Sequence, residues 1–502
     1  MKYFRFAILF LILAEIFSFC AFLFPAFNKI CFFTVILITL ILALKKLEYG
    51  IYILFSELFI GSFGYLFFYE SNGVKISLRI GLFLAIMSIF IAEILIFSDK
   101  RKKFIGRIKE HKFIKYYFIL SLIFLWGILW GIIRKNGFDN VFFDANSYFY
   151  FALIFPLVAV IYKKDQIKNI FSILTASCVV ISIKALFLLF IFSHKINYAM
   201  RHLYIWTRDF RLGELTLWQG GFYRIFSQSH IYALIGLFLV FLTMIEKNYE
   251  LFGFNDLEIQ NKKFKMFFFN FILYILFFSV IILGMSRSFW VGGLAAILAL
   301  YFFYIFILKI SWKSLAKLSG WLVAGFFISV IILFSVVKFP YPKESAVFSF
   351  DLLSERAVSI SGEAGASSRW NLLPVLIKNI FRRPIIGSGF GATLTYKSND
   401  PRALASSPTG EYTTYAFEWG YLDIILKIGL LGMLLYLLLV WKLFREGWDK
   451  LRVAETGRCF APIAGLMLGL IVVLATNVFS PYMNHPLGMG YIMFISVAIS
   501  IL

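Results

Sequence analysis

Charged residues are scarce in this sequence: Asp, Glu, Lys and Arg together make up 15% of its 502 residues, whereas hydrophobic residues make up 61%. So few charged side chains could not cover the apolar core of a water-soluble protein of this length. The composition therefore excludes a soluble globular protein and predicts one that crosses a membrane many times.

Cysteine is rare as well, and its four positions fall within apolar runs, without a Cys-x-x-Cys pair or a nearby cluster of His, Asp or Glu. Cysteines in such surroundings behave as small hydrophobic residues. We therefore expect neither a disulfide framework nor a metal site. The four residues are Cys20, Cys31, Cys178 and Cys459.

Acidic residues are too few to balance the basic ones, 27 against 49, which leaves a formal net charge of +22. A basic protein can bind nucleic acid, but these charges are spread over short loops and accompany no RNA-binding or DNA-binding motif. In a membrane protein, an excess of positive charge bears first on orientation and on anionic lipid. We expect the membrane, and no nucleic acid, as a partner.

Apolar runs of about 15 to 25 residues predict fourteen membrane-spanning helices, of which a few are short enough to be re-entrant. No A-x-A cleavage site follows the first run, so we interpret it as a helix and not as a signal peptide. The expected fold class is an all-α polytopic membrane protein with about 14 (12–14) transmembrane helices. The runs are 6–24, 30–44, 50–69, 76–97, 116–133, 148–162, 169–193, 229–245, 266–284, 289–308, 318–337, 420–441, 460–476 and 487–502.

These runs place helices one to eleven in residues 1–337, a large extracytoplasmic loop subdomain in residues 338–419, and the last three helices in residues 420–502. If the N-terminus is cytoplasmic, the short loops on that side hold 27 Lys and Arg, against 11 on the other side. Lys and Arg are enriched in short cytoplasmic loops. We therefore predict that both termini are cytoplasmic.

Arg287 lies in the middle of the longest apolar run, within GMSRSFWVGG. As one helix, residues 266–308 would extend about 64 Å, roughly twice the hydrocarbon core, so the run must turn near Arg287. Arginine binds phosphate oxygens with two parallel hydrogen bonds, and a charge in such a place tends to mark a functional site. Lipid headgroups or nearby acids would also explain the outer arginines.

The predicted outer loop at 194–228 carries several arginines among Tyr, Trp and Phe, including Arg208, Arg211 and Arg224. Aromatic faces and guanidinium groups together suit a ligand with both sugar rings and phosphates, although an interfacial aromatic belt would have a similar composition. Arg224 directly precedes a new span in FYRIFSQSHIY and should lie on the same side as Arg287.

The loop at 338–419 contains SSRWNLLPVLIKNIFRRPIIGSGFGA, which predicts an amphipathic helix that begins at Ser367 or Ser368 and ends before Pro384. Alternating glycines follow, and they could present backbone N–H groups to an anion. The loop closes with YTTYAFEWGYLDIILKIGLLG, where Glu418 precedes the next span. A carboxylate there would be partly desolvated and could act as a general base, or could pair with an outer arginine.

From about residue 130 onward, these segments resemble the O-antigen ligase and O-antigen polymerase family, integral membrane glycosyltransferases of the GT-C type. The similar segments are FYRIFSQSHIY, GMSRSFW, RWNLLPVLIKNIFRRPIIGSGFG, EWGYLDIILKIGLLG and TNVFSPYMNHPLG. The resemblance implies a GT-C-like fold in the cytoplasmic membrane of a prokaryote, with the active site on its outer face.

In that family two arginines hold the diphosphate of an undecaprenyl-diphosphate-linked glycan, and the resemblance places this role on Arg224 and Arg287. The ligase branch has a His-Asn-x-Tyr-Leu stretch whose histidine is proposed to activate the acceptor hydroxyl. Glu418 stands in its place here, so the resemblance fits a polymerase as well as a ligase. The matching segments add Arg369, His230 and Tyr421 to Arg208 and Arg211 as substrate-binding candidates.

Such a transfer needs no cofactor, because fixed guanidinium groups can stabilise the leaving diphosphate while a base deprotonates the acceptor. The predicted partners are a lipid-linked oligosaccharide donor and a glycan, lipid or protein acceptor. The inner loops lack a DxD motif and a phosphate-binding loop, which favours a lipid donor over a nucleotide sugar. His230 and His485 are alternative bases, although a histidine beside a span is more often structural.

A transporter or flippase of lipid-linked glycans is the main alternative, since it would share the spans and the arginines. It should have two related halves and charges facing a central cavity. We find no internal repeat, but charged residues within or beside the predicted spans keep this hypothesis open: Glu15, Glu57, Glu93, Lys184 and Lys427. A structural scaffold would not explain Arg287.

Overall fold

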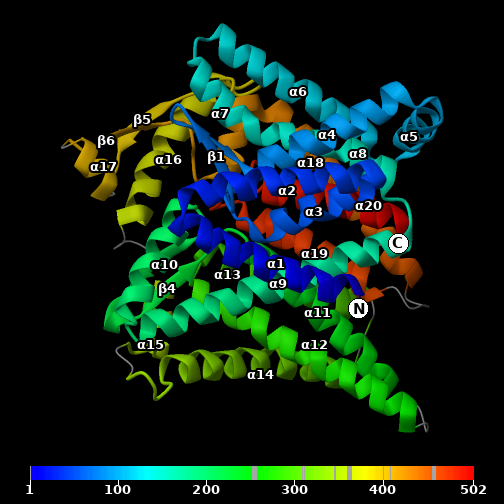
Figure 1. The fold of residues 1–502 in the computed structure, drawn as a ribbon, viewed down its shortest axis with the longest axis vertical. Coiled ribbons are helices and arrows are strands. Elements are labelled where there is room, and N and C mark those ends of the chain that lie inside the picture. Colours follow the sequence, from blue (N-terminus) through cyan, green and yellow to red (C-terminus); the bar gives the residue numbers. More distant parts are fainter. Residues whose placement is uncertain are drawn as a thin grey trace.

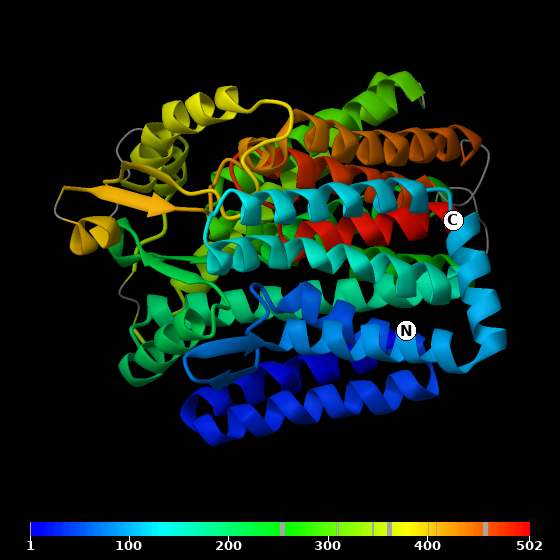
Figure 2. The ribbon, with the colours of Figure 1, turned by 90° about the horizontal axis from the view of Figure 1, so that it is seen from above.

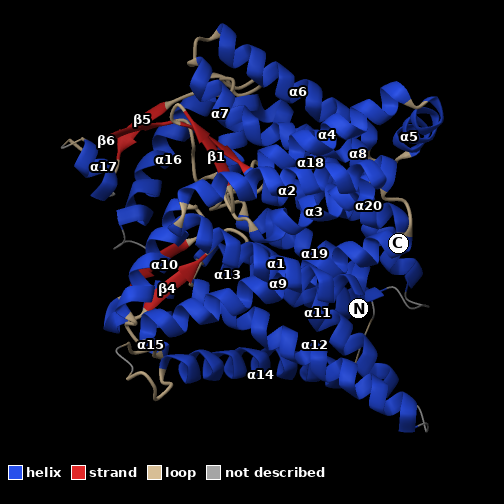
Figure 3. Cartoon of the chain, viewed as in Figure 1, coloured by secondary structure: helices blue, strands red, loops and turns tan. Residues whose placement is uncertain are grey.

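The computed structural model is a bundle of helices that run in roughly one direction and its reverse (Figure 1; Figure 2). It describes residues 2–251, 257–307, 309, 311–343, 346–358, 364–399, 401–407, 409–454 and 460–502. Within these ranges the strands form three two-stranded antiparallel hairpins, and nearly all other regular structure is helical (Figure 3). The expectation of an all-α polytopic membrane protein is confirmed at this level.

Ten helical segments in the described ranges are long and apolar enough to cross a membrane. They are α1 (Lys2–Leu23), α2 (Pro25–Lys45), α4 (Leu78–Ile96), α6 (Ile114–Ile133), α7 with η1 and α8 (Phe138–Phe149, Tyr150–Leu153, Ile154–Val160), α9 (Lys164–Ser193), α12 (Leu257–Gly284), α13 (Arg287–Phe302, followed by η3, Phe303–Ile307), α14 (Trp312–Val337) and α18 (Gly420–Ala454).

Four further helices occupy the remaining predicted runs: α3 (Leu47–Ile60), α11 (His230–Leu251), α19 (Phe460–Thr476) and α20 (Pro486–Ile501). Every predicted run in the described ranges therefore contains a helix. That all fourteen cross the membrane stays a prediction.

The predicted boundary of the third span is wrong, because α3 ends at Ile60 and not near residue 69. Ser62 has a φ of 51° and Gly64 a φ of 91°, so the chain turns and enters the hairpin β1 (Phe68–Ser71) and β2 (Val74–Ser77). Local apolar composition could not reveal this turn. In the opposite sense, α18 continues to Ala454, well beyond the predicted residue 441.

The hairpins and several short helices gather at one end of the bundle, on the left in Figure 1. They include the hairpins β3 (Glu214–Leu217) with β4 (Tyr223–Phe226) and β5 (Leu394–Lys397) with β6 (Glu411–Thr414), and the helices α10 (Asn197–Asp209), α15 (Phe350–Val358), α16 (Ala364–Arg382) and α17 (Pro401–Ser406). Both chain ends and α5 (Ser98–Glu110) lie toward the other end. Which end faces the cytoplasm stays a prediction.

The loop at 338–419 packs onto the bundle through a small apolar cluster of its own. Leu372 and Leu376 of α16 meet Leu394 of β5, Phe417 and Leu426 of α18. α16 is already helical at Ala364, before the predicted start at Ser367 or Ser368, and it ends at Arg382, before Pro384 as predicted. The division into a separate subdomain stays a prediction.

Candidate active site

The turn between α12 and α13 lies where the predicted run had to reverse. α12 ends at Gly284, Met285 adopts a φ of 43°, and Arg287 is the first residue of α13. The expected turn at Arg287 is confirmed. The side chain of Ser286 does not cap α13, so the first turn of that helix presents backbone N–H groups and a partial positive charge.

Arg224 reaches this turn from β4. Its Nε donates to the carbonyl oxygen of Gly284 at 2.8 Å, and its guanidinium lies 4.9 Å from the centre of the Phe226 ring. The hairpin positions it by pairing Arg224 with Thr216. Two arginines that are far apart in the sequence therefore meet at residues 284–287.

Arg356 of α15 joins them, and the sequence pattern did not single it out. Its Nε donates to the carbonyl oxygen of Met285 at 3.1 Å, and its own carbonyl oxygen accepts from Nε of Arg287 at 2.9 Å. The Arg356 guanidinium lies 5.0 Å from the Trp218 ring, and the residue is only 8% exposed. No motif marks this arginine among the basic residues of its loop, since only the tertiary contacts distinguish it.

We call Arg224, Arg287 and Arg356 the arginine turn. Three guanidinium groups meet at one turn, beside the N-terminus of α13, where the helix dipole is positive. An anion is the ligand that such a place stabilises most, and guanidinium groups beside backbone N–H groups are typical of phosphate sites. The arrangement can bind a polyanion and stabilise negative charge that develops on it.

Glu418 forms an ion pair with Nε of Arg369, as one of the two sequence interpretations expected. Its side chain is 54% exposed, so the protein does not enclose it. The residue lies in the loop before α18 begins at Gly420, and its expected partial desolvation at the membrane boundary stays a prediction. Next to it, Trp419 Nε1 donates to the carbonyl oxygen of Arg369 at 3.1 Å.

The turn between α19 and α20 links Glu418 to the arginine turn. The Trp419 ring packs on Phe479 with 5.6 Å between ring centres. The hydroxyls of Ser480 and Ser288 are 3.1 Å apart, and Ser288 directly follows Arg287. The segments with Glu418 and with Arg287 therefore rest on neighbouring residues of one turn, within TNVFSPYMNHPLG.

Three of the other substrate-binding candidates make contacts away from the arginine turn. Arg208 is exposed and pairs with Asp209 at 3.0 Å, and that carboxylate raises the pKa of Arg208. Arg211 lies over the Tyr65 ring at 5.0 Å. The hydroxyl of Tyr421 donates to the carbonyl oxygen of Leu474 at 2.8 Å, which holds α18 against α19.

Both histidines that we considered as bases are buried at the starts of helices. Nδ1 of His230 accepts from the N–H of Ser227 at 3.4 Å before α11, close to Gly284. Nδ1 of His485, directly before α20, accepts from the N–H of Leu487 at 3.3 Å. The carbonyl oxygen of Leu487 in turn accepts from the hydroxyl of Tyr232. These contacts give both rings a structural role in this conformation.

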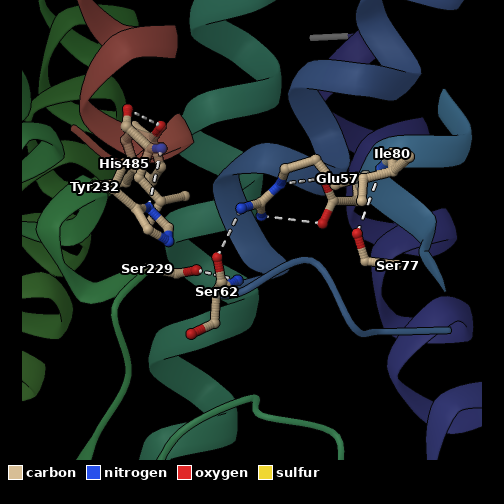
Figure 4. A network of polar contacts seen from close by, with 9 residues as sticks. Glu57, Ser62, Ser77, Ile80, Ser229, Tyr232 and His485 are labelled. Atoms are coloured by element: carbon tan, nitrogen blue, oxygen red, sulfur yellow. Dashed lines mark hydrogen bonds and ion pairs between the residues drawn. The ribbon is translucent and has the colours of Figure 1, made fainter. Parts of the chain in front are cut away.

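Figure 4 shows the polar network in which His485 lies beside Tyr232. The guanidinium of Arg79 pairs with Glu57 at 2.9 Å and donates to the carbonyl oxygen of Ser62 at 2.9 Å. The N–H of Ser62 in turn donates to the hydroxyl of Ser229, at the start of α11. This network ties the turn after α3 to the helix that follows Arg224.

The comparison with known protein families supports what the geometry suggests. Residues 271–437 match the family model of the O-antigen ligases. This third of the chain is similar to the O-antigen ligase domain. The resemblance to the O-antigen ligase and polymerase family is thereby confirmed. The matched stretch holds Arg287, Arg356, Arg369 and Glu418, whereas Arg224 and the turn before α20 lie outside it. A comparison with curated proteins finds no match.

Within the ligase domain, the glycine segment does not form the anion nest that the sequence suggested. The N–H groups of Ser388 and Gly389 donate to the carbonyl oxygens of Leu426 and Lys427, and that of Gly391 donates to Asp144. These N–H groups already have protein partners. The glycines serve close packing, because a Cβ at Gly389 would lie 2.4 Å from the backbone nitrogen of Gly131.

The two residues at 384–385, just before these glycines, supply acceptors at a break in α18 at Gly429, whose φ is 73°. The N–H groups of Leu430 and Leu431 donate to the carbonyl oxygens of Pro384 and Ile385, at 2.8 and 3.2 Å. Backbone groups freed by a break in a membrane helix need such partners, because lipid offers none. The loop before β5 therefore packs directly against α18 and completes its backbone hydrogen bonding.

A buried ion cluster lies beside the break. Lys427 Nζ contacts Asp144 at 2.5 Å and Asp423 at 2.6 Å, and these three side chains are at most 7% exposed. Asn484, from the turn that also carries Phe479 and Ser480, donates to Asp423. Burial, with Asp144 as a second cause, raises the pKa of the nearby Tyr415. Through Asn484, the cluster contacts the turn between α19 and α20, on which the segments with Glu418 and with Arg287 both pack.

Proposed function

We propose that this membrane protein transfers a glycan from an undecaprenyl-diphosphate carrier to an acceptor hydroxyl on the outer face of the cytoplasmic membrane. Surface polysaccharide assembly, by polymerisation or ligation, is the process to which such a reaction belongs. The convergence of Arg224, Arg287 and Arg356 on one turn in a chain with an O-antigen ligase domain carries the proposal.

In the proposed reaction the acceptor oxygen attacks the anomeric carbon, and the bond from that carbon to the diphosphate oxygen breaks with inversion. The diphosphate leaves with the bonding electrons, and the guanidinium groups stabilise its growing charge. Glu418 accepts the proton of the acceptor hydroxyl. The arginines supply positive charge where other transferases use a divalent cation, so the proposed transfer is independent of metal.

The transporter hypothesis loses its main support, because each charge that kept it open has an ion partner. Lys184 pairs with Glu15 at 2.7 Å, Arg79 pairs with Glu57, and Lys100 pairs with Glu93. Lys427 lies in the cluster with Asp144 and Asp423. Paired charges stabilise helix packing and do not require a central aqueous path.

The decisive experiment incubates purified, reconstituted protein with a polyprenyl-diphosphate oligosaccharide and separates the products. A ladder of lengths indicates a polymerase, and one transfer to a separate acceptor indicates a ligase. Arg287→Lys and Arg224→Lys should each reduce turnover by about a hundredfold or more, since charge remains but the bidentate donor geometry is lost.

Arg101→Lys is the matched control, because Arg101 is an exposed residue of α5, at the end of the bundle opposite the arginine turn. It should retain nearly full activity. All variants should insert in equal amounts and elute as the unaltered protein does. Intact donor after incubation with the unaltered protein would contradict the proposed function.

A further inference from the structure

An apolar groove opens directly beside the arginine turn, between α11, α12 and α13, and Leu322 of α14 also lines it. Its volume is about 200 Å³, and its lining is apolar or aromatic, with Leu237, Phe241, Phe278, Phe289, Gly293 and Ile297 among the lining residues. An apolar cavity of roughly 150 Å³ already holds a small hydrocarbon such as benzene. We call this site the prenyl groove.

The groove exists because the two helices that leave the arginine turn pack on different neighbours. α12 packs against α11 and α14, whereas α13 packs against α19. Adjacent glycines of α13 show the two environments. A Cβ at Gly292 would lie 2.4 Å from the Thr476 hydroxyl oxygen of α19, whereas one at Gly293 would meet only Leu234, at 3.6 Å.

The dimensions suit a chain that descends from the membrane surface. From Arg287 to Ile297 the helix rises about 15 Å, which is half of a hydrocarbon core of roughly 30 Å. Phe238 and Phe241 of α11 form a buried floor, at 2% and 0% exposure. Leu294, which also lines the groove, is 58% exposed, so the groove opens sideways to lipid.

We propose that the prenyl groove binds the first isoprene units of the carrier lipid whose diphosphate lies at the arginine turn. This inference rests on the proposed function and adds where the lipid chain lies. The groove begins at Phe289, two positions after Arg287, so head and tail of one amphiphile contact consecutive turns of α13. An ordinary phospholipid presents one phosphate, whereas the clustered guanidinium groups suit two adjacent phosphates.

The test uses a graded series at Gly293 with a polyprenyl diphosphate that carries a diazirine in its first isoprene units. Ultraviolet light should attach this probe to residues of α11, α12 and α13, as mapped by mass spectrometry. Gly293→Ala should be tolerated, because the nearest atom leaves room for a methyl group. Gly293→Val and Gly293→Leu enter the groove and should lower crosslinking progressively, by roughly tenfold or more for Leu.

Gly320→Leu is the matched control, because a Cβ at Gly320 of α14 meets nothing within 4 Å. It should crosslink like the unaltered protein. In transfer assays, the Gly293→Leu variant should raise KM for the undecaprenyl donor by a similar factor. It should leave turnover nearly unchanged for a glycosyl diphosphate that carries a methyl group in place of the prenyl chain, because this donor does not enter the groove.

Crosslinking reports binding without catalysis, so the groove and the proposed function can fail separately. Labels outside α11, α12, α13 and the stretch of α14 around Leu322, or equal competition by excess phosphatidylglycerol, would show that bulk lipid occupies the groove and would overturn the inference. Equal labelling of Gly293→Leu and the unaltered protein would overturn it too. Specific labelling without any glycan transfer would retain the groove and refute the enzymatic proposal.

Discussion

The sequence resemblance places Glu418 where the ligase branch of the family has a histidine, and its ion pair with Arg369 gives it a defined position before α18. A base must accept the proton of an acceptor hydroxyl, so the acceptor has to reach the carboxylate beside its arginine partner. We expect Glu418→Gln to slow transfer by about 10²-fold to 10⁴-fold while donor crosslinking stays intact. Single-turnover measurements with saturating donor test this expectation.

Arg369→Gln separates catalysis from the ion pair, since it removes the partner but keeps the carboxylate. If Glu418 is the base, Arg369→Gln should keep much more activity than Glu418→Gln. Equal losses in the two variants would assign the pair a structural role and place the base elsewhere.

Single residues also show how far sequence patterns reach. Arg287 is predictable because one guanidinium interrupts a long apolar run, and Arg224 because it directly precedes a span. Arg356 is not predictable, since its neighbours Trp218 and Met285 come from distant segments. The glycines at 387–391 match an anion-binding pattern. The sequence does not show, however, that their backbone N–H groups donate to carbonyl and carboxylate oxygens of other helices.

Among the elements, α18 shows a break that its apolar run concealed. Lys427 balances two carboxylates beside Gly429, where N–H groups of the helix donate to carbonyl oxygens of the loop before β5. Periodicity predicts a continuous helix because the flanking turns are both apolar and regular. The carbonyl groups that repair the break come from about 45 residues upstream, a distance that no local pattern reports.

We expect Lys427→Met to destabilise the protein strongly, because it leaves two buried carboxylates without their cation. Removing one partner of a buried ion pair typically costs about 3 to 5 kcal/mol. The triple variant Lys427→Met, Asp144→Asn, Asp423→Asn removes all three charges and should recover much of this loss. Thermal unfolding in detergent, followed by tryptophan fluorescence, compares the two. A triple variant as unstable as the single one would contradict the electrostatic explanation.

At the scale of the whole molecule, apolar runs predict helices well, because lipid requires every backbone group to be satisfied within a helix. They predict helix ends poorly, as α3 and α18 show, since ends depend on turns and on polar contacts such as the pair of Arg79 with Glu57. Sidedness is a separate matter. The grouping of both chain ends opposite the hairpins agrees with an even number of spans but does not orient the bundle.

Cysteine labelling can orient it. In a background with the native cysteines replaced by serine, Glu411→Cys in β6 and Lys103→Cys in α5 place exposed thiols at opposite ends of the bundle. If the positive-inside pattern determines orientation, a membrane-impermeant maleimide should label Glu411→Cys in intact spheroplasts and Lys103→Cys only after permeabilisation. The reverse result would put the arginine turn on the cytoplasmic face, where it could not act on glycans already translocated across the membrane.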